Sequence, residues 1–199
     1  MPARRRKSLF QKSAAVVRWL HIYISMLGFA ALMFFAVTGI TLNHPTWLGG
    51  SDQVVRDSTG QLPSELVQRM DRLAIAERIR RDHQLRGAVH EFEVDDYECM
   101  IVFKGPAYAA DVFVDRESGE YSLSVSTSSW VGLMNDLHKG RDSGLAWSWI
   151  IDVSALLMIL MSLTGIVLLL YLKRRRLSGL VAAVVGTLFL LAFVVIAIA

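Results

Sequence analysis

Residues 14–44 read AAVVRWLHIYISMLGFAALMFFAVTGITLNH, and this stretch decides the fold of the chain. Arg18 is the only charged residue in the apolar run, which exceeds the ~20 residues that a helix needs to cross a bilayer. His21 and His44 bracket most of the run and would lie about 34 Å apart at a helical rise of about 1.5 Å per residue. The sequence therefore predicts a transmembrane helix over 14–43 with a histidine near each membrane boundary.

Two further apolar segments follow near the end of the chain. Residues 145–172 contain a single ionisable side chain, Asp152, and residues 177–199 contain no charged side chain. Both segments are long enough to span a bilayer. The chain is thus predicted to have three transmembrane helices, the last two joined by the short basic turn 173–176.

Basic residues define the expected orientation. They cluster in 1–13, which contains no acidic residue, and again in the turn 173–176. Because segments rich in Lys and Arg stay in the cytoplasm, both clusters are placed there, and residues 45–144 lie outside the membrane. We expect a multi-pass protein of the bacterial inner membrane with this segment in the periplasm.

The basic residues and the first apolar run exclude two other interpretations. The net charge of +3 comes from clusters at membrane edges, so nucleic-acid binding is not expected. The first run is longer than the core of a signal peptide and lacks a cleavage site of small residues, so it is interpreted as an uncleaved anchor. Cys99 is the only cysteine, which excludes an intrachain disulfide and a covalent two-cysteine haem attachment.

The segment 45–144 has its own periodicity. Apolar residues recur at helical spacing over 63–83, which predicts one amphipathic helix. Apolar and polar residues then alternate in short runs separated by turn residues. These runs cover residues 89–94, 99–103, 109–114 and 120–125. The expected domain is an α+β module with one helix on an antiparallel sheet of three or four strands.

The turn region 113–120, FVDRESGE, resembles the end of a PepSY domain, in which strands flank a turn of the form Val-Asp-x-x-Ser/Thr-Gly-Glu. It lies between two membrane segments that carry the pairs Leu20-His21 and Leu137-His138. The arrangement from about residue 14 to 176 is similar to the PepSY-associated transmembrane helix family. That resemblance implies an inner-membrane redox protein that binds haem b through histidines at helix ends and reduces ferric siderophores or related acceptors. Other members are known by domain name only.

A short internal repeat accompanies these pairs. Leu20-His21 precedes Thr38-Gly39-Ile40, and Leu137-His138 precedes Thr164-Gly165-Ile166. The two helices run in opposite directions, so the halves would be inverted in the membrane, and inverted repeats often place sites at their interface. The alternative is that such short matches arose by chance.

His44 and His138 form the expected pair of axial haem ligands. Both are expected at the extracytoplasmic boundary of the inner membrane, one just after the first span and one shortly before the second. Membrane b-type cytochromes hold iron through neutral imidazoles whose second nitrogen is hydrogen-bonded. The alternatives are a purely structural role at the interface or a site for another transition metal.

Four polar residues near this boundary are candidates for holding the ligand rings. They are Asn43, Asp136, Asp142 and Asp152. Asp152 could instead pair with Arg141 or serve proton or metal transfer. No catalytic residue is assigned, and the motifs of proteases and nucleotide-binding proteins are missing from the sequence.

His21 is a further candidate ligand, for an inner haem, but no second histidine occurs near the cytoplasmic side. Its partner would be His21 of a second copy, another subunit, or a methionine such as Met161. His83 and His90 belong to the extracytoplasmic module and are expected to be structural.

Two function classes follow. The first is a b-type haem component that passes electrons to a periplasmic acceptor, such as a ferric chelate or a flavoprotein. The second is a non-enzymatic accessory subunit whose PepSY module binds a periplasmic partner or helps to assemble a membrane complex. The first class predicts a coloured protein, and the second predicts a colourless one that tolerates loss of its histidines.

Overall fold

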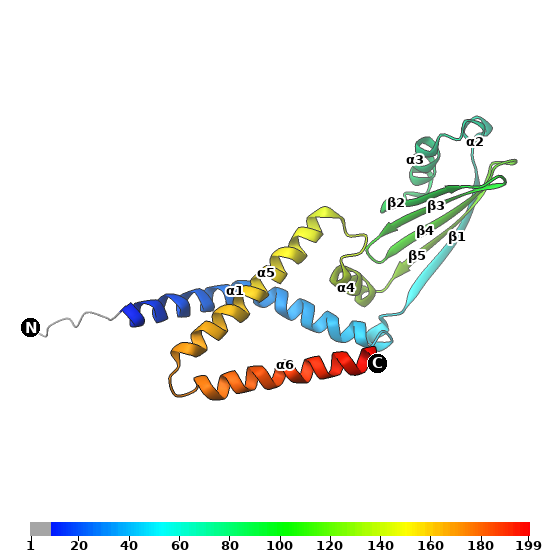
Figure 1. Cartoon of the computed structure of the whole chain (residues 1–199). Helices are drawn as coiled ribbons and strands as arrows, with labels where there is room; N and C mark the ends of the chain where they lie inside the picture. The colour runs from blue at the N-terminus through cyan, green and yellow to red at the C-terminus, as the bar shows by residue number, and fades with distance from the viewer. Residues whose placement is uncertain (1–8) are drawn as a thin grey trace, which may run out of the picture. The chain divides into compact units, whose positions relative to one another are not determined.

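The computed structural model describes residues 9–199 and divides them into two compact units, residues 34–151 and residues 9–33 with 152–199. Three helices are long and apolar enough to cross a membrane, as the sequence predicted. They are α1 (Leu9–Asn43), α5 (Gly144–Tyr171) and α6 (Arg176–Ile198) (Figure 1). The predicted N-terminal segment 1–13 lies partly in α1 and partly outside the described residues.

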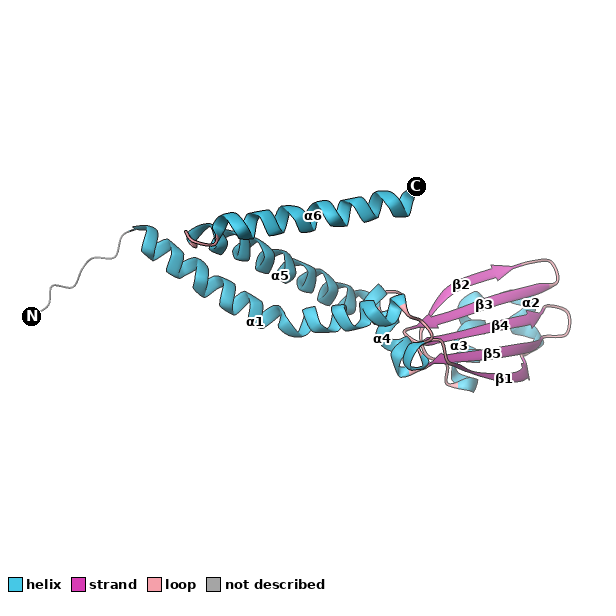
Figure 2. Ribbon diagram, turned by 90° about the horizontal axis from the view of Figure 1, so that it is seen from below, coloured by secondary structure: helices cyan, strands magenta, loops and turns pink. Residues whose placement is uncertain are grey.

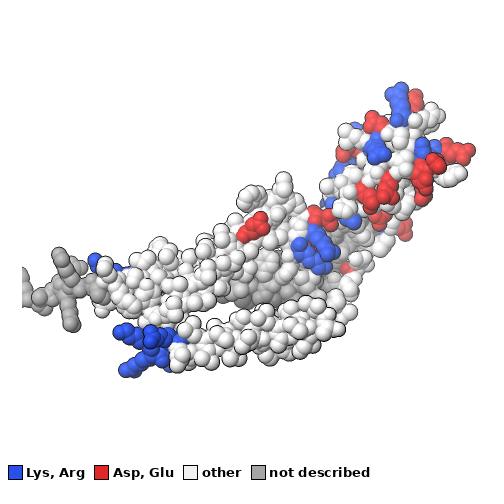
Figure 3. Space-filling model, viewed as in Figure 1, with Lys and Arg blue, Asp and Glu red and all other residues white. Residues whose placement is uncertain are grey.

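The helices α5 and α6 are joined by a short turn that carries the basic cluster. The N–H groups of Arg175 and Arg176 both donate to the carbonyl of Leu172 at 2.9 Å, which reverses the chain. Figure 3 shows the positive charge gathered at this turn and a nearly uncharged surface along both helices. Exposed apolar side chains along the helices are what a lipid-facing surface requires.

The module between α1 and α5 contains a five-stranded antiparallel sheet, one strand more than the predicted maximum. The strands are β1 (Gln53–Gln61), β2 (Ala88–Val94), β3 (Glu98–Gly105), β4 (Tyr108–Asp115) and β5 (Glu120–Ser128) in the spatial order β1-β5-β4-β3-β2 (Figure 2). The strand β1 was missed because its sequence, QVVRDSTGQ, is polar and almost fully exposed. It forms only through pairing with β5, from Gln53 opposite Ser128 to Gln61 opposite Glu120.

The prediction of a single helix over 63–83 was wrong. The chain forms α2 (Ser64–Arg69) and α3 (Arg72–His83), separated at Met70, whose φ of 49° is left-handed and ends the first helix. Asp71 then begins α3 by accepting a hydrogen bond from the N–H of Ala74. The break lets α3 lie on the sheet.

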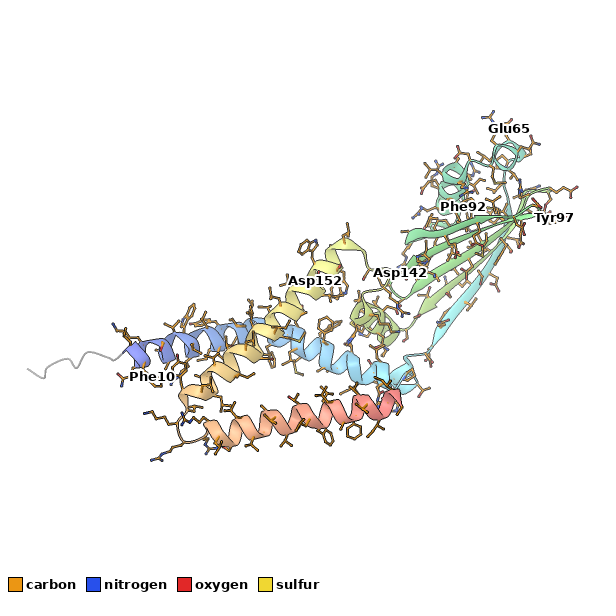
Figure 4. All side chains as sticks on the ribbon, viewed as in Figure 1. Phe10, Glu65, Phe92, Tyr97, Asp142 and Asp152 are labelled. Atoms are coloured by element: carbon orange, nitrogen blue, oxygen red, sulfur yellow. The ribbon has the colours of Figure 1, made fainter. Side chains whose placement is uncertain are left out.

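One face of the sheet is covered by α2 and α3 (Figure 2). Ile75 and Ile79 of α3 are buried with Ile101 and Phe103 of β3, and together with side chains of β4 and β5 they form the hydrophobic core. Figure 4 labels Glu65 on α2, Phe92 on β2 and Tyr97 in the β2–β3 turn. The module therefore has a conventional core, and its outer surface is mixed in charge (Figure 3).

The turn that carries the PepSY resemblance is closed by Asp115. Its Oδ1 accepts hydrogen bonds from the N–H groups of Glu117 and Ser118 and from the hydroxyl of Ser118. These bonds favour the carboxylate and lower the pKa of Asp115, the backbone N–H of Ser118 having the largest effect. Gly119 completes the turn with a φ of 76°.

A short helix that the sequence analysis did not predict, α4 (Trp130–Lys139), follows β5. Ser129 caps its start by accepting from the N–H of Gly132 at 3.1 Å, and Gly140 ends it with a φ of 69°. Asn135 and His138, three residues apart, therefore lie on one face of a helix rather than in a loop.

Candidate functional site

The C-terminal end of α1 and the helix α4 meet through polar side chains. Thr41 donates to Oδ1 of Asn135 at 2.6 Å, and Oγ1 of Thr38 lies 2.6 Å from Nδ1 of His138. Thr38, Thr41 and Asn135 are each at least nine-tenths buried. Unpaired polar groups are costly away from water, so these contacts hold α4 in a defined position on α1.

His138 is surrounded by apolar groups on its other sides. Its ring lies edge-on to Phe35, with 5.1 Å between centroids, and a Cβ added at Gly39 would lie 3.8 Å from its Cε1. The indole N–H of Trp147 donates to the carbonyl of Leu137 at 2.7 Å. The distance at Gly39 is an ordinary van der Waals contact, so the imidazole lies beside α1 without crowding it.

The surroundings of His138 favour the neutral form of its ring. Burial lowers the pKa of His138, and the positive charge of Lys139 lowers that pKa further. Within residues 9–199, Nδ1 is the ring nitrogen with a hydrogen-bond partner. A neutral imidazole with one nitrogen held and the other unengaged is the form that binds a metal.

His44, the other predicted outer ligand, has different surroundings. Its ring stacks on the indole of Trp47, with 3.8 Å between centroids and 8° between planes. Its Nε2 lies 3.5 Å from Nδ2 of Asn43, a long contact on an exposed surface. The structure therefore holds His138 firmly through a buried hydroxyl and His44 only by stacking.

His21 forms the counterpart of the His138 contact in the other unit. Its Nδ1 lies 3.0 Å from Oγ1 of Thr164 on α5. A Cβ added at Gly165 would lie 3.3 Å from Cε1 of His21. The predicted methionine, Met161, contributes its carbonyl oxygen to Thr164, at 3.0 Å from the hydroxyl.

The two copies of the internal repeat thus contact each other reciprocally. The histidine of each Leu-His pair contacts the threonine and the glycine of the opposite Thr-Gly-Ile triplet. Sequence reasoning noted both motifs but did not pair them, because the crossing depends on the unpredicted helix α4.

Three of the polar residues predicted to hold the ligand rings do not contact the predicted ligand histidines in the described residues. Two of them have other partners, and the third is exposed. Asp136 accepts from the N–H of Ala107 at 3.0 Å and so ties α4 to the β3–β4 turn. Asp142, in the loop after α4 (Figure 4), lies 3.7 Å from Nδ1 of His90. Asp152 is exposed on α5 (Figure 4). The hydroxyl of Thr38 takes the place expected for these carboxylates.

The module also has a groove of about 630 Å³ between the end of α3 and the strands β1 and β5. Arg56, Arg86 and His83 line it, with Asp52 as the acidic residue of the lining. His83 is fixed there by a contact of 2.9 Å between its Nε2 and the hydroxyl of Tyr121. In the described part of the chain, three or more His, Cys, Asp or Glu side chains nowhere gather closely enough to hold a metal ion.

Three membrane-spanning helices with an α+β module inserted between the first and the second define the class of protein. The family model described as Putative PepSY_TM-like matches residues 15–199, and the chain belongs to this family. The predicted resemblance is therefore confirmed. No curated protein matches the chain significantly. No solved structure does so either.

Proposed function

We propose that the protein is a b-type haem redox component of the bacterial inner membrane that passes electrons to an extracytoplasmic acceptor such as a ferric chelate or a flavoprotein. The observation that supports this function is the state of His138. Its ring is half-buried beside Phe35, which favours the neutral form, and one nitrogen is held by Thr38. Histidines that ligate metals are held in the same way by a partner on the second nitrogen.

The residues around His138 fit a porphyrin in chemistry. Imidazole nitrogen is the usual protein ligand of b-type haem iron, and Phe34, Phe35 and Trp147 supply aromatic surface at the same end of α1. When bound, haem would supply one-electron transfer between ferric and ferrous iron. In this proposal His138 and His44 would hold the haem, since both belong to the outer end of the span.

The protein residues have separate tasks in this proposal. Thr38 orients the imidazole of His138, and the aromatic side chains exclude water from the ligand. The groove of the module, with Arg56 and Arg86, would attract an anionic acceptor such as a ferric chelate. The electrons would come from a quinol or a cytoplasmic donor.

The orientation proposed for the chain follows the basic residues. The turn between α5 and α6 is the strongest cluster of positive charge on these helices (Figure 3). Such clusters remain in the cytoplasm, which places the sheet module in the periplasm. His138 and His44 would then serve the periplasmic side.

The test is the reduced-minus-oxidised absorption spectrum of the protein purified in mild detergent with haem added. We expect sharp α and Soret bands in the wild type, loss of these bands in His138→Ala, and loss or weakening in His44→Ala. His90→Ala is the matched control, since His90 is half exposed on an edge strand. A wild-type protein without bands would contradict the proposal.

A second function is supported by the geometry of His44 and of the groove. The ring of His44 is engaged with Trp47, and the His138–Thr38 contact also serves to dock α4. In this alternative the chain is an accessory subunit whose groove binds a periplasmic partner, and haem plays no part. Colourless protein that retains partner binding after histidine substitution would favour it.

A further inference from the structure

We infer that Thr38 and Thr164 select the tautomer of two histidines, so that the neutral forms of His138 and His21 each present an unprotonated Nε2 from equivalent half-sites of an inverted repeat. Each threonine is a positioning residue that acts through its histidine. The tautomer assignment stands on hydrogen bonding alone, whereas the use of Nε2 as an iron ligand rests on the proposed function.

The tautomer follows from the position of one hydroxyl proton at each site. Oγ1 of Thr38 lies 2.6 Å from the carbonyl oxygen of Phe34, and Oγ1 of Thr164 lies 2.7 Å from that of Leu160. A carbonyl oxygen can only accept, and two oxygens this close repel each other unless a proton lies between them. Each hydroxyl therefore donates to its own helix, as threonines in membrane helices commonly do.

The hydroxyl oxygen then has only acceptor capacity left for the histidine. Nδ1 lies 2.6 Å from Thr38 in His138 and 3.0 Å from Thr164 in His21, so Nδ1 must carry the proton in both contacts. In a neutral imidazole with Nδ1–H, the lone pair is on Nε2. The threonine thus selects which nitrogen is available to a metal.

A glycine follows each threonine and lies beside the same edge of the ring. Cε1 of His138 lies where a Cβ of Gly39 would be in contact at 3.8 Å, and Cε1 of His21 lies 3.3 Å from the corresponding point at Gly165. The Nδ1–Cε1 edge of each ring therefore lies against a threonine and the glycine that follows it on the neighbouring helix. The Nε2 atoms of both rings have no hydrogen-bond partner among residues 9–199.

The test is ¹⁵N NMR of histidine-labelled protein without haem, in which the two ring nitrogens give distinct signals for each tautomer. The signals of the two histidines are assigned by their loss in His21→Gln and His138→Gln. We expect both histidines of the wild type to be protonated at Nδ1 only. Thr38→Val and Thr164→Val should convert their own histidine to a mixture of tautomers, and Thr38→Ser and Thr164→Ser should restore the single form.

Two threonines serve as matched controls. Thr41 makes a buried contact between α1 and α4 without touching a histidine, and Thr187 bonds its own helix on α6. Thr41→Val and Thr187→Val should leave both tautomers unchanged. Nε2–H protonation of either histidine in the wild type would overturn the inference. Unchanged tautomers in the two valine variants at Thr38 and Thr164 would overturn it as well, and the wild-type and serine spectra remain decisive if a valine variant does not fold.

A haem titration separates this inference from the proposed function. If haem binds, Thr38→Val should weaken its affinity about 10- to 100-fold, the usual effect of removing the partner of a metal-bound histidine, and Thr38→Ser should recover most of it. Full haem affinity in Thr38→Val would contradict the positioning role. If no haem binds while the tautomers are as expected, the proposed function fails and the inference stands.

Discussion

The sheet module and the helices bury opposite kinds of side chain. In the described residues, every buried hydrophobic side chain lies between Leu62 and Leu123 of the module. The buried polar side chains are Thr38, Thr41, Asn135 and Ser154, all on α1, α4 and α5. The module folds as a water-soluble domain does, by removing apolar surface from water.

The helices follow the rule that holds in lipid. Apolar side chains gain little by leaving lipid for the protein interior, so helices associate through small residues and hydrogen-bonded polar ones. The defined contacts between these helices are therefore made by their few hydroxyl, amide and imidazole groups. We therefore expect stability to depend mainly on apolar residues in the module and on polar residues in the helices.

The largest effect is expected for a core substitution in the module. Phe103 is fully buried, and Phe103→Ala should lower the free energy of unfolding by about 3–5 kcal/mol. Leu163→Ala on α5 should change it far less, because more than half of the Leu163 surface is exposed. Thermal unfolding followed by circular dichroism measures both, and equal losses would contradict the comparison.

An intermediate effect is expected where α4 meets α1. Asn135→Ala removes the amide partner of the buried Thr41 hydroxyl, which can still donate to the carbonyl of Thr38 at 3.0 Å, so the loss should cost about 0.5–1.5 kcal/mol. Hydrogen exchange of the α4 amides should accelerate accordingly. Asn43→Ala, at an exposed and weak contact, is the control and should leave the exchange unchanged. Similar exchange in both variants would show that α4 is held in another way.

A smaller, pH-dependent effect is expected at Asp115. Because its pKa is lowered in the folded state, the carboxylate stabilises the module fully above the unfolded value of about 3.9, and this stability is lost as the pH falls through the folded pKa. Asp115→Asn should therefore lower Tm at pH 7, and the difference from wild type should shrink in acid. A difference between Asp115→Asn and wild type that stays constant with pH would contradict the assignment.

The smallest effect is expected from the two glycines of the repeat. Gly165→Ala would bring a Cβ to 3.3 Å from His21, so that ring must shift by a few tenths of an ångström. Gly39→Ala would create an ordinary contact at 3.8 Å with His138. We expect Gly165→Ala to lower Tm more than Gly39→Ala, by less than ~1 kcal/mol in free energy. The reverse order would contradict the ring positions.

The elements with strong local signals were predictable. Three apolar runs gave the spans, and alternation gave β2 to β5. The strand β1 has polar residues and depends on pairing with β5, more than fifty residues away, so its own sequence did not mark it. The helix α4 has a capping serine at Ser129, but its turn back onto α1 depends on tertiary contacts.

The candidate site was predictable only in part. Residue type and position at helix ends marked His138, His44 and His21 as candidate ligands. The expected depth in the membrane then paired His138 with His44. The partners of the rings were predicted to be three aspartates and Asn43. Asn43 lies near His44, whereas Thr38 and Thr164 are the residues in contact with His138 and His21. The repeat contained this information, but only the fold shows that its two halves cross.

The most direct test of the proposed function is the reduction potential of haem in His138→Met, measured by redox titration against the wild type. A thioether ligand in place of imidazole raises the potential of haem iron. We predict a higher potential in His138→Met and no change in His90→Met, whose side chain lies on the edge strand β2. An unchanged potential in His138→Met, with haem bound, would show that His138 is not a ligand.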